Sequence, residues 1–194
     1  MLRCMLDHEQ RLQADGVRPR LEMVGKKGAN YMKFMRRSIE SAITDVEDRI
    51  EFARVAEMAD RYMRMFAAGE IGRVDVAYMR FVSVGSQVPT VTQLLPIEPP
   101  EGGDDSRRNV PFEFSPPPEQ LLARLIPETV KIRLYQCFND AIVSEQVARM
   151  VAMKAATDAA GDMIKYLSRQ YNRARQSQIT MELADIVGGA AAVE

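Results

Sequence analysis

Apolar positions along this chain follow two different periods. A three-and-four spacing, typical of a helix packed along one side, covers residues 50–68, and Gly69 ends it. Alternating apolar and polar residues predict strands at 73–82 and 88–95. Weaker signals predict the other elements of this half: the end of a helix at 6–13, a strand at 18–24, a short helix at 29–37 and a weak strand at 39–43. Because strands and helices alternate, we expect an α/β fold with a small Rossmann-like sheet domain over residues 1–95.

Proline separates this region from the rest of the chain. Seven of the ten prolines fall between positions 96 and 118, together with Gly102, Gly103 and the polar run 104–109. This composition predicts a linker over residues 96–117. The β-forming residues 110–114 predict a short strand inside the linker.

Residues 118–194 have a helical pattern throughout. Residues 118–126 predict a short helix, and Pro127 can open a second one, because proline is tolerated at the first helical position. No proline follows between residues 128 and 187, and Gly161 is the single glycine there. At 1.5 Å per residue such a helix would be about 90 Å long, so a domain of this size could not bury it.

A helix of this length needs pairing along a seam, which repeats every three to four residues. One seam is predicted at Leu134, Phe138, Ala141, Ala148, Ala152, Ala155 and Ala159. Its four alanines between residues 148 and 159 would let a partner helix approach closely. The apolar stripe then shifts, first to Ile164, Leu167, Tyr171 and Ala174, and next to Ile179, Leu183 and Ile186. This drift indicates irregular winding, or different partners at different heights.

Charge is segregated along the same helix. The whole chain has 26 basic and 27 acidic residues, so its net charge of -1 gives no general attraction to nucleic acid or anionic lipid. Between residues 163 and 181, however, there are four basic residues and no acid: Lys165, Arg169, Arg173 and Arg175. This run fits a solvated face, a contact with an acidic partner surface or, less well in a neutral chain, nucleic acid.

The residues that carry catalysis are sparse. Cys4 and Cys137 are the only cysteines and His8 is the only histidine, which argues against thiolate zinc sites and two-imidazole metal sites. The turn at residues 25–28 has the glycines and lysines of a phosphate-binding turn but not the spacing of a nucleotide motif, and we interpret its lysines as solvated. We therefore predict no catalytic site, cofactor or metal. No apolar run is long enough to cross a bilayer.

Several strings of residues resemble one known family. The runs SEQVARMVAMKAAT at 144–157 and YNRARQSQITMELADIVGGAAA at 171–192 resemble the C-terminal helix of the gamma subunit of the F-type ATP synthase. The run FVSVGSQVPTVTQLLP at 81–96 is similar to the strands of that family's central domain, and residues 25–33 are similar to its glycine and basic turn. The resemblance covers the chain from about residue 25 onward.

This resemblance implies a non-catalytic rotor shaft that couples proton flow to ATP synthesis or hydrolysis. The implied partners are the alpha and beta subunits, the epsilon subunit and the membrane c-ring, at the cytoplasmic face of a bacterial inner membrane, without nucleic acid and without direct membrane insertion. Arg149 would lie on the shaft, and four residues would face loops of the beta subunit: Arg175, Gln176, Thr180 and Glu182. An apolar upper bearing would include Ile179, Leu183, Ile186 and Val187. The family's foot would include the strand around Phe112 and Phe114.

The sequence departs from the family at its start. A complete member has an N-terminal helix antiparallel to the long one, followed by the first strand of the sheet, and neither precedes Met1. We therefore expect a fragment or a mis-assigned start, with an incomplete sheet and a long helix that forms half of an antiparallel coiled coil. Such a chain would not support rotation alone, and it would self-associate through the alanine seam. The alternative function is a coiled-coil scaffold or adaptor with an α/β protein-binding head.

Overall fold

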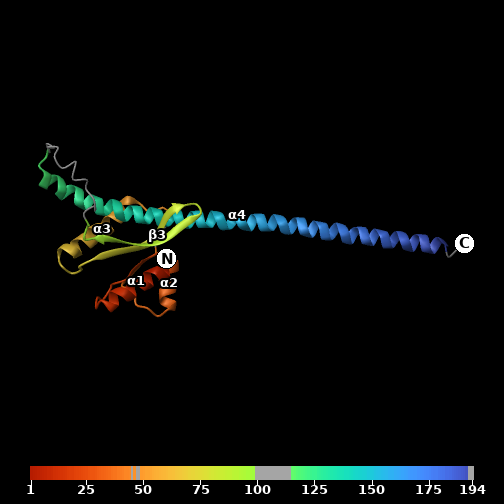
Figure 1. Ribbon diagram of the computed structural model, residues 1–194, viewed down its shortest axis with the longest axis horizontal. Helices are drawn as coiled ribbons and strands as arrows, with labels where there is room; N and C mark the ends of the chain where they lie inside the picture. The colour runs from red at the N-terminus through yellow and green to blue at the C-terminus, as the bar shows by residue number, and fades with distance from the viewer. Residues whose placement is uncertain (45, 47–48, 99–114, 192–194) are drawn as a thin grey trace, which may run out of the picture. The chain divides into compact units, whose positions relative to one another are not determined.

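The computed structural model describes residues 1–44, 46, 49–98 and 115–191. These residues fall into two compact units, Met1–Gln146 and Val147–Glu194. The elements follow one another in the order α1 (Leu2–Ala14), β1 (Glu22–Val24), α2 (Lys26–Phe34), β2 (Ser41–Ile43), α3 (Phe52–Ala67), β3 (Val74–Ser83), β4 (Ser86–Leu95) and α4 (Pro118–Ala191). The predicted α/β class with a long C-terminal helix is thus confirmed (Figure 1).

The described strands form two small sheets in the first unit. The strands β1 and β2 are parallel, with Met23 opposite Ala42, and α2 connects them. The strands β3 and β4 form an antiparallel hairpin that runs from the pair Val74 and Leu95 to the pair Ser83 and Ser86. The α2 connection gives a βαβ unit, which is the local arrangement expected for a Rossmann-like domain. The predicted strand at 110–114 lies outside the described residues.

The prediction of two helices around Pro127 is wrong, because α4 continues through this proline. A proline inside a helix removes the amide that would bond to the carbonyl four residues earlier. Here that carbonyl belongs to Ala123, which lies in an exposed stretch of α4 where water can bond to it. The usual cost of an interior proline is therefore reduced. The division of the chain into domains at residues 96–117 stays a prediction.

Two clusters of buried side chains hold the first unit together. The larger cluster joins α3, β4 and α4 and consists of Ile50, Val55, Ala59, Leu94, Leu95, Val130 and Leu134. The smaller one contains three methionines, Met5, Met23 and Met32, from α1, β1 and α2. Methionine suits such an irregular space because its side chain is unbranched and adaptable.

The larger cluster changes the interpretation of the predicted seam. Leu134 is 3% exposed and packs in the cluster, and Phe138 is partly buried against it. The start of the seam is therefore covered by α3 and β4 of the chain itself rather than by an antiparallel coiled-coil partner. In contrast, the alanines at 148, 152, 155 and 159 are all exposed.

Truncating Leu134 tests whether α4 is part of this core. We expect Leu134→Ala to lower the free energy of unfolding of the first unit by about 2–5 kcal/mol, since it leaves a cavity in a packed cluster. The matched variant Leu183→Ala truncates the same side chain where it is 61% exposed, and it should change the value by less than about 0.5 kcal/mol. Urea unfolding followed by circular dichroism measures both. Equal effects of the two variants would contradict the packing described here.

Candidate interaction surface of the long helix

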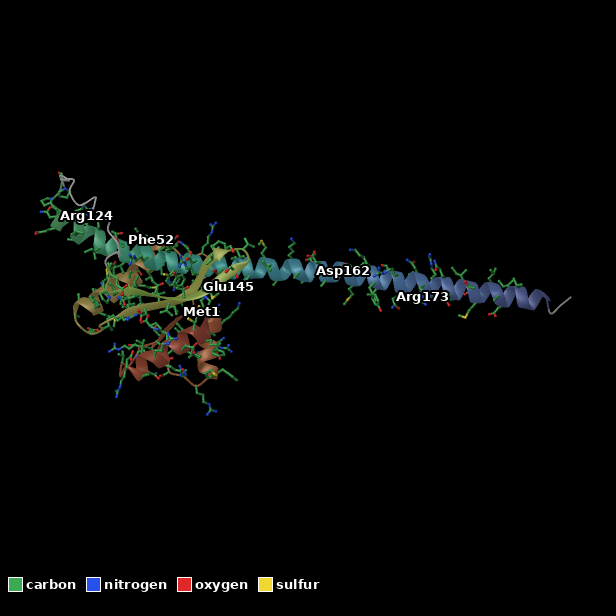
Figure 2. The ribbon with its side chains drawn as sticks, in the orientation of Figure 1. Met1, Phe52, Arg124, Glu145, Asp162 and Arg173 are labelled. Carbon is green, nitrogen blue, oxygen red and sulfur yellow. The ribbon has the colours of Figure 1, made fainter. Side chains whose placement is uncertain are left out.

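The described part of the second unit is a stretch of α4, and none of its residues from 147 to 189 is buried. From residue 148 to residue 189 every side chain is exposed except at Gly161, which is intermediate. The exposed residues include large apolar ones, such as Met163 at 64%, Tyr171 at 68% and Ile186 at 69%. Figure 2 shows Asp162 and Arg173 projecting from this part of the helix. Soluble proteins seldom leave so continuous an apolar surface uncovered, so this stretch is a candidate interaction surface.

All the partner-contacting residues proposed from the sequence lie on this surface. The exposed set comprises Arg149, Arg175, Gln176, Ile179, Thr180, Glu182, Leu183 and Ile186. The apolar members, with Val187, recur at intervals of four, three and one residues, which places them on one face of the helix. Phe112 and Phe114, proposed for the foot, lie outside the described residues.

Three polar residues of this set, Gln176, Thr180 and Glu182, take part in hydrogen bonds within the helix. The Thr180 hydroxyl donates to the Gln176 carbonyl over 2.8 Å, as threonine commonly does in helices. The Gln178 amide donates to the Glu182 carboxylate over 3.2 Å. Because these contacts are exposed, they hold the side chains only loosely and leave them able to bind a partner.

The basic run of the helix also faces solvent. Lys165 pairs with Asp162 at 3.4 Å, with side chains 75% and 79% exposed, so the pair contributes little to stability. Within the described part of the chain, no ion pair neutralises Arg169, Arg173 or Arg175. The arrangement fits both a solvated face and contact with an acidic surface.

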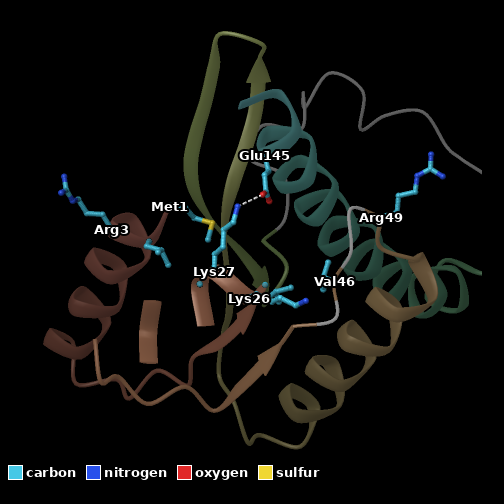
Figure 3. A pocket seen from close by; sticks show the side chains of 11 residues that line it. Met1, Arg3, Lys26, Lys27, Val46, Arg49 and Glu145 are labelled. Carbon is cyan, nitrogen blue, oxygen red and sulfur yellow. Dashed lines mark hydrogen bonds and ion pairs between the residues drawn. The ribbon is translucent and has the colours of Figure 1, made fainter. Parts of the chain in front are cut away.

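A hollow of about 1150 Å³ lies in the first unit, at the start of α2. Its lining includes Arg3, Lys26, Lys27, Arg49 and Glu145 (Figure 3). The predicted tight turn is present, with Gly25 at φ 102 before the first residue of α2. Lys27 is solvated as predicted, with its side chain 91% exposed, and its ammonium group also lies 3.1 Å from the Glu145 carboxylate. Sequence patterns could not signal this pair, because its members are 118 positions apart.

Two observations limit the chemistry of the described residues. No three of their histidine, cysteine and acidic side chains come together as metal ligands would. His8 pairs with Asp75 at 2.9 Å, and Arg73 binds the same carboxylate at 2.8 Å, so these residues join α1 to β3.

Among the described helices, none has the length and apolar character needed to span a membrane.

A partly buried polar cluster ties α3 to β1. Arg61 lies 2.5 Å from the Glu22 carboxylate, and the Tyr62 hydroxyl donates to the same carboxylate over 2.7 Å. Burial, together with the hydrogen bond to Glu22 and its negative charge, raises the pKa of Tyr62 from its ordinary value of 10.0 to about 12. Ionisation of Tyr62 would place a second negative charge beside Glu22, so the cluster depends on the neutral phenol.

The fold and this surface define a class of protein: a small α/β body carrying a long helix that other chains are expected to cover. A family model described as ATP synthase matches residues 1–193. The chain belongs to this family. Curated relatives named ATP synthase gamma chain include that of Rhodopirellula baltica, which is 43% identical over 178 residues, covering 88% of this chain and 60% of the relative. The relative from Leptospira biflexa strain Patoc 1 / Ames is 34% identical over 193 residues, covering 100% of this chain and 67% of its own length.

Solved structures share the fold. A chain of the Euglena gracilis mitochondrial ATP synthase, in a structure of OSCP, F1 and c-ring, has a TM-score of 0.59 and 16% identity over 97% of this chain and 66% of its own. A chain of the Tetrahymena thermophila central stalk and c-ring has a TM-score of 0.50 and 21% identity over 69% and 58%. The chain described here spans about 60% of the length of the Rhodopirellula baltica relative.

The raised pKa of Tyr62 predicts how stability depends on pH. In the unfolded chain a tyrosine ionises near pH 10, whereas in the folded chain Tyr62 ionises near pH 12. The neutral Tyr62 phenol therefore contributes its full stabilisation to the folded chain below pH 10, and this stabilisation is lost as the pH rises from 10 to 12. We expect Tyr62→Phe to reduce this loss, measured as urea unfolding at pH 9, 10 and 11. Tyr166→Phe on the exposed helix is the control, and an equal slope for Tyr62→Phe and the parent chain would contradict the prediction.

Proposed function

We propose that this chain forms the rotor shaft of an F-type ATP synthase, as part of its gamma chain. In this role α4 passes through a ring of alpha and beta subunits, and its rotation couples proton flow to ATP synthesis or hydrolysis in that ring. The chain itself is non-catalytic. The observation that carries the proposal is a helix in which no side chain is buried from residue 148 to residue 189, in a chain of the ATP synthase family.

The two chemical faces of α4 suit different contacts in such a ring. Ile179, Leu183 and Ile186 are 56%, 61% and 69% exposed and would turn inside an apolar bearing. Four residues would face loops of the beta subunit: Arg175, Gln176, Thr180 and Glu182. Arg149 would lie on the shaft. A neighbouring helix, antiparallel to α4, would cover the exposed alanines and complete a coiled coil.

Further partners follow from the same proposal. The α/β body would face the epsilon subunit and the membrane c-ring, and the complex would sit at the cytoplasmic face of a bacterial inner membrane as a peripheral assembly. Moving one proton across 100 mV releases about 2.3 kcal/mol, so the shaft must carry several such increments without melting. A helix without proline from residue 128 to residue 191 is suited to this load.

Binding of the chain to an alpha–beta complex tests the proposal. We expect the chain to co-elute with alpha and beta subunits of a gamma-chain relative in size-exclusion chromatography. The triple variant Ile179→Ala, Leu183→Ala and Ile186→Ala should weaken binding by at least about tenfold, because it removes apolar contacts at the bearing. The matched control truncates three apolar residues at the start of α4 with 53%, 49% and 48% exposure: Leu122, Leu125 and Ile126. Failure of the unmodified chain to bind would favour the adaptor function instead.

The basic run gives a separate prediction. If Arg173 and Arg175 meet an acidic surface, Arg175→Glu should weaken binding to the alpha–beta complex about five- to tenfold at low salt. The loss should shrink as salt rises, because added ions screen exposed charges. Lys154→Glu makes the same change of charge outside the run and is the control. Equal binding of the two variants at every salt concentration would support a solvated face.

A further inference from the structure

The side of α4 that faces the α/β body is buried at regular intervals. Val130, Leu134 and Cys137 are 0%, 3% and 7% exposed, and Ser144 follows at 4%. The intervals are four, three and seven residues, so the row repeats like one stripe of a heptad pattern. Ser144 is the last buried residue of α4 in the described part of the chain.

Apolar packing fixes only in part which heptad of α4 meets the body. Burial of apolar surface has no preferred direction, and a shift by seven residues would place the smaller, uncharged Cys137, Ala141 and Ser144 where Val130, Leu134 and Cys137 now lie, a change that packing opposes only through lost volume. A directional polar contact can exclude such a shift, as single polar residues do in coiled coils. A hydrogen bond at the end of the row would therefore fix the register of the whole row.

Ser144 makes a contact of this kind with β3. Its hydroxyl donates to the Met79 carbonyl over 3.2 Å. The residue opposite Met79 in β4 is Pro89, which has no backbone N–H and so cannot donate to this carbonyl. The hydroxyl of α4 thus supplies a donor where the facing residue of the hairpin cannot. Loss of the Ser144 hydroxyl would therefore remove the donor that α4 supplies to this partly buried carbonyl.

The next residue of α4 is held by a different element. The Glu145 carboxylate lies 3.1 Å from the ammonium group of Lys27 in the first turn of α2, as Figure 3 shows. The Lys27 side chain is 91% exposed, so the pair is weak by itself. It nevertheless restrains α4 from a second direction, directly beside the Ser144 hydrogen bond.

We propose that Ser144 and the Lys27–Glu145 pair form a register lock that fixes where α4 sits along the α/β body. The lock lies where the buried row of α4 ends, so a twist of the exposed helix would reach the body first at this point. This mechanical role rests on the proposed rotor function. Ser144, Lys27 and Glu145 are positioning residues, because they act through the placement of the helix.

Charge exchange separates this lock from a general effect of mutation. In the full chain, Lys27→Glu and Glu145→Lys should each speed amide hydrogen exchange of residues 138–146 about threefold to fivefold, because like charges then face each other. The double variant, which restores opposite charges, should return exchange to within about twofold of the parent chain. Lys33→Glu reverses a charge elsewhere on α2 and is the control. A double variant as fast as either single variant would overturn the proposal.

The hydroxyl is tested in the same measurement. Ser144→Ala should speed exchange of residues 138–146 about tenfold, whereas Ser144→Thr, which keeps the hydroxyl, should restore slow exchange. Equal rates for the alanine variant and the parent chain would overturn the register role of Ser144.

The mechanical role has its own readout in the assembled ATP synthase. There the ratio of ATP-driven proton pumping to ATP hydrolysis should fall at least twofold for Lys27→Glu and recover in the double variant. An unchanged ratio beside faster exchange would overturn the mechanical role. Failure of the parent chain to assemble would instead overturn the proposed function, while the exchange data would still decide the lock.

Discussion

The packing of α4 against α3 and β4 is the interaction on which the rest of the structure depends. Val130 and Leu134 enter the cluster formed by Ile50, Val55 and the two leucines of β4, and they anchor the helix to the body. From residue 147 to residue 189 no residue of α4 is buried. The remaining sources of stability for this part of α4 are the intrinsic helix propensity of its residues and contacts with partner chains.

The sequence predicted most of the secondary structure because the local signals were strong. The stripe at Ile50, Val55 and Ala59 marked α3, and its members are indeed buried. The alternation around Val74, Val76 and Tyr78 marked β3 in the same way, although β1 is shorter than the predicted strand. Where the prediction was wrong, the reason was context: α4 continues through Pro127 in an exposed stretch where water can bond to the freed carbonyl, and this exposure cannot be seen in the sequence.

The sequence predicted that α4 would have an exposed surface, but it did not predict at which residue this surface begins. The absence of proline and the drifting stripe indicated a helix too long for its own domain, and the exposure of Ile179, Leu183 and Ile186 agrees with that. The seam at Leu134 and Phe138 gave no sign that the body itself would cover it. The contact between Lys27 and Glu145 joins residues 118 positions apart, so no local sequence pattern can predict it. The partner roles of the individual exposed residues rest on the family resemblance.

The chain thus combines a short buried part of α4, which is held by directional contacts, with a long exposed part. In an ATP synthase these parts would have complementary tasks, one fixing the body to the helix and the other meeting the surrounding subunits. Alanine-rich stretches of α4 keep its backbone helical where packing does not help. The same stretches leave room for the close approach of another helix.

Oxidation of methionines tests the central claim most directly, because they occur in both parts of the chain. Met163 and Met181 are 64% and 61% exposed on α4, whereas Met23 and Met32 are 4% and 0% exposed in the body. With dilute hydrogen peroxide and mass spectrometry, the isolated chain should form sulfoxide at Met163 and Met181 at least about tenfold faster than at Met23 and Met32. Added alpha and beta subunits should slow oxidation of Met163 and Met181 and leave the two buried methionines unchanged. Oxidation of Met163 and Met181 at the same rate with and without these subunits would contradict the account.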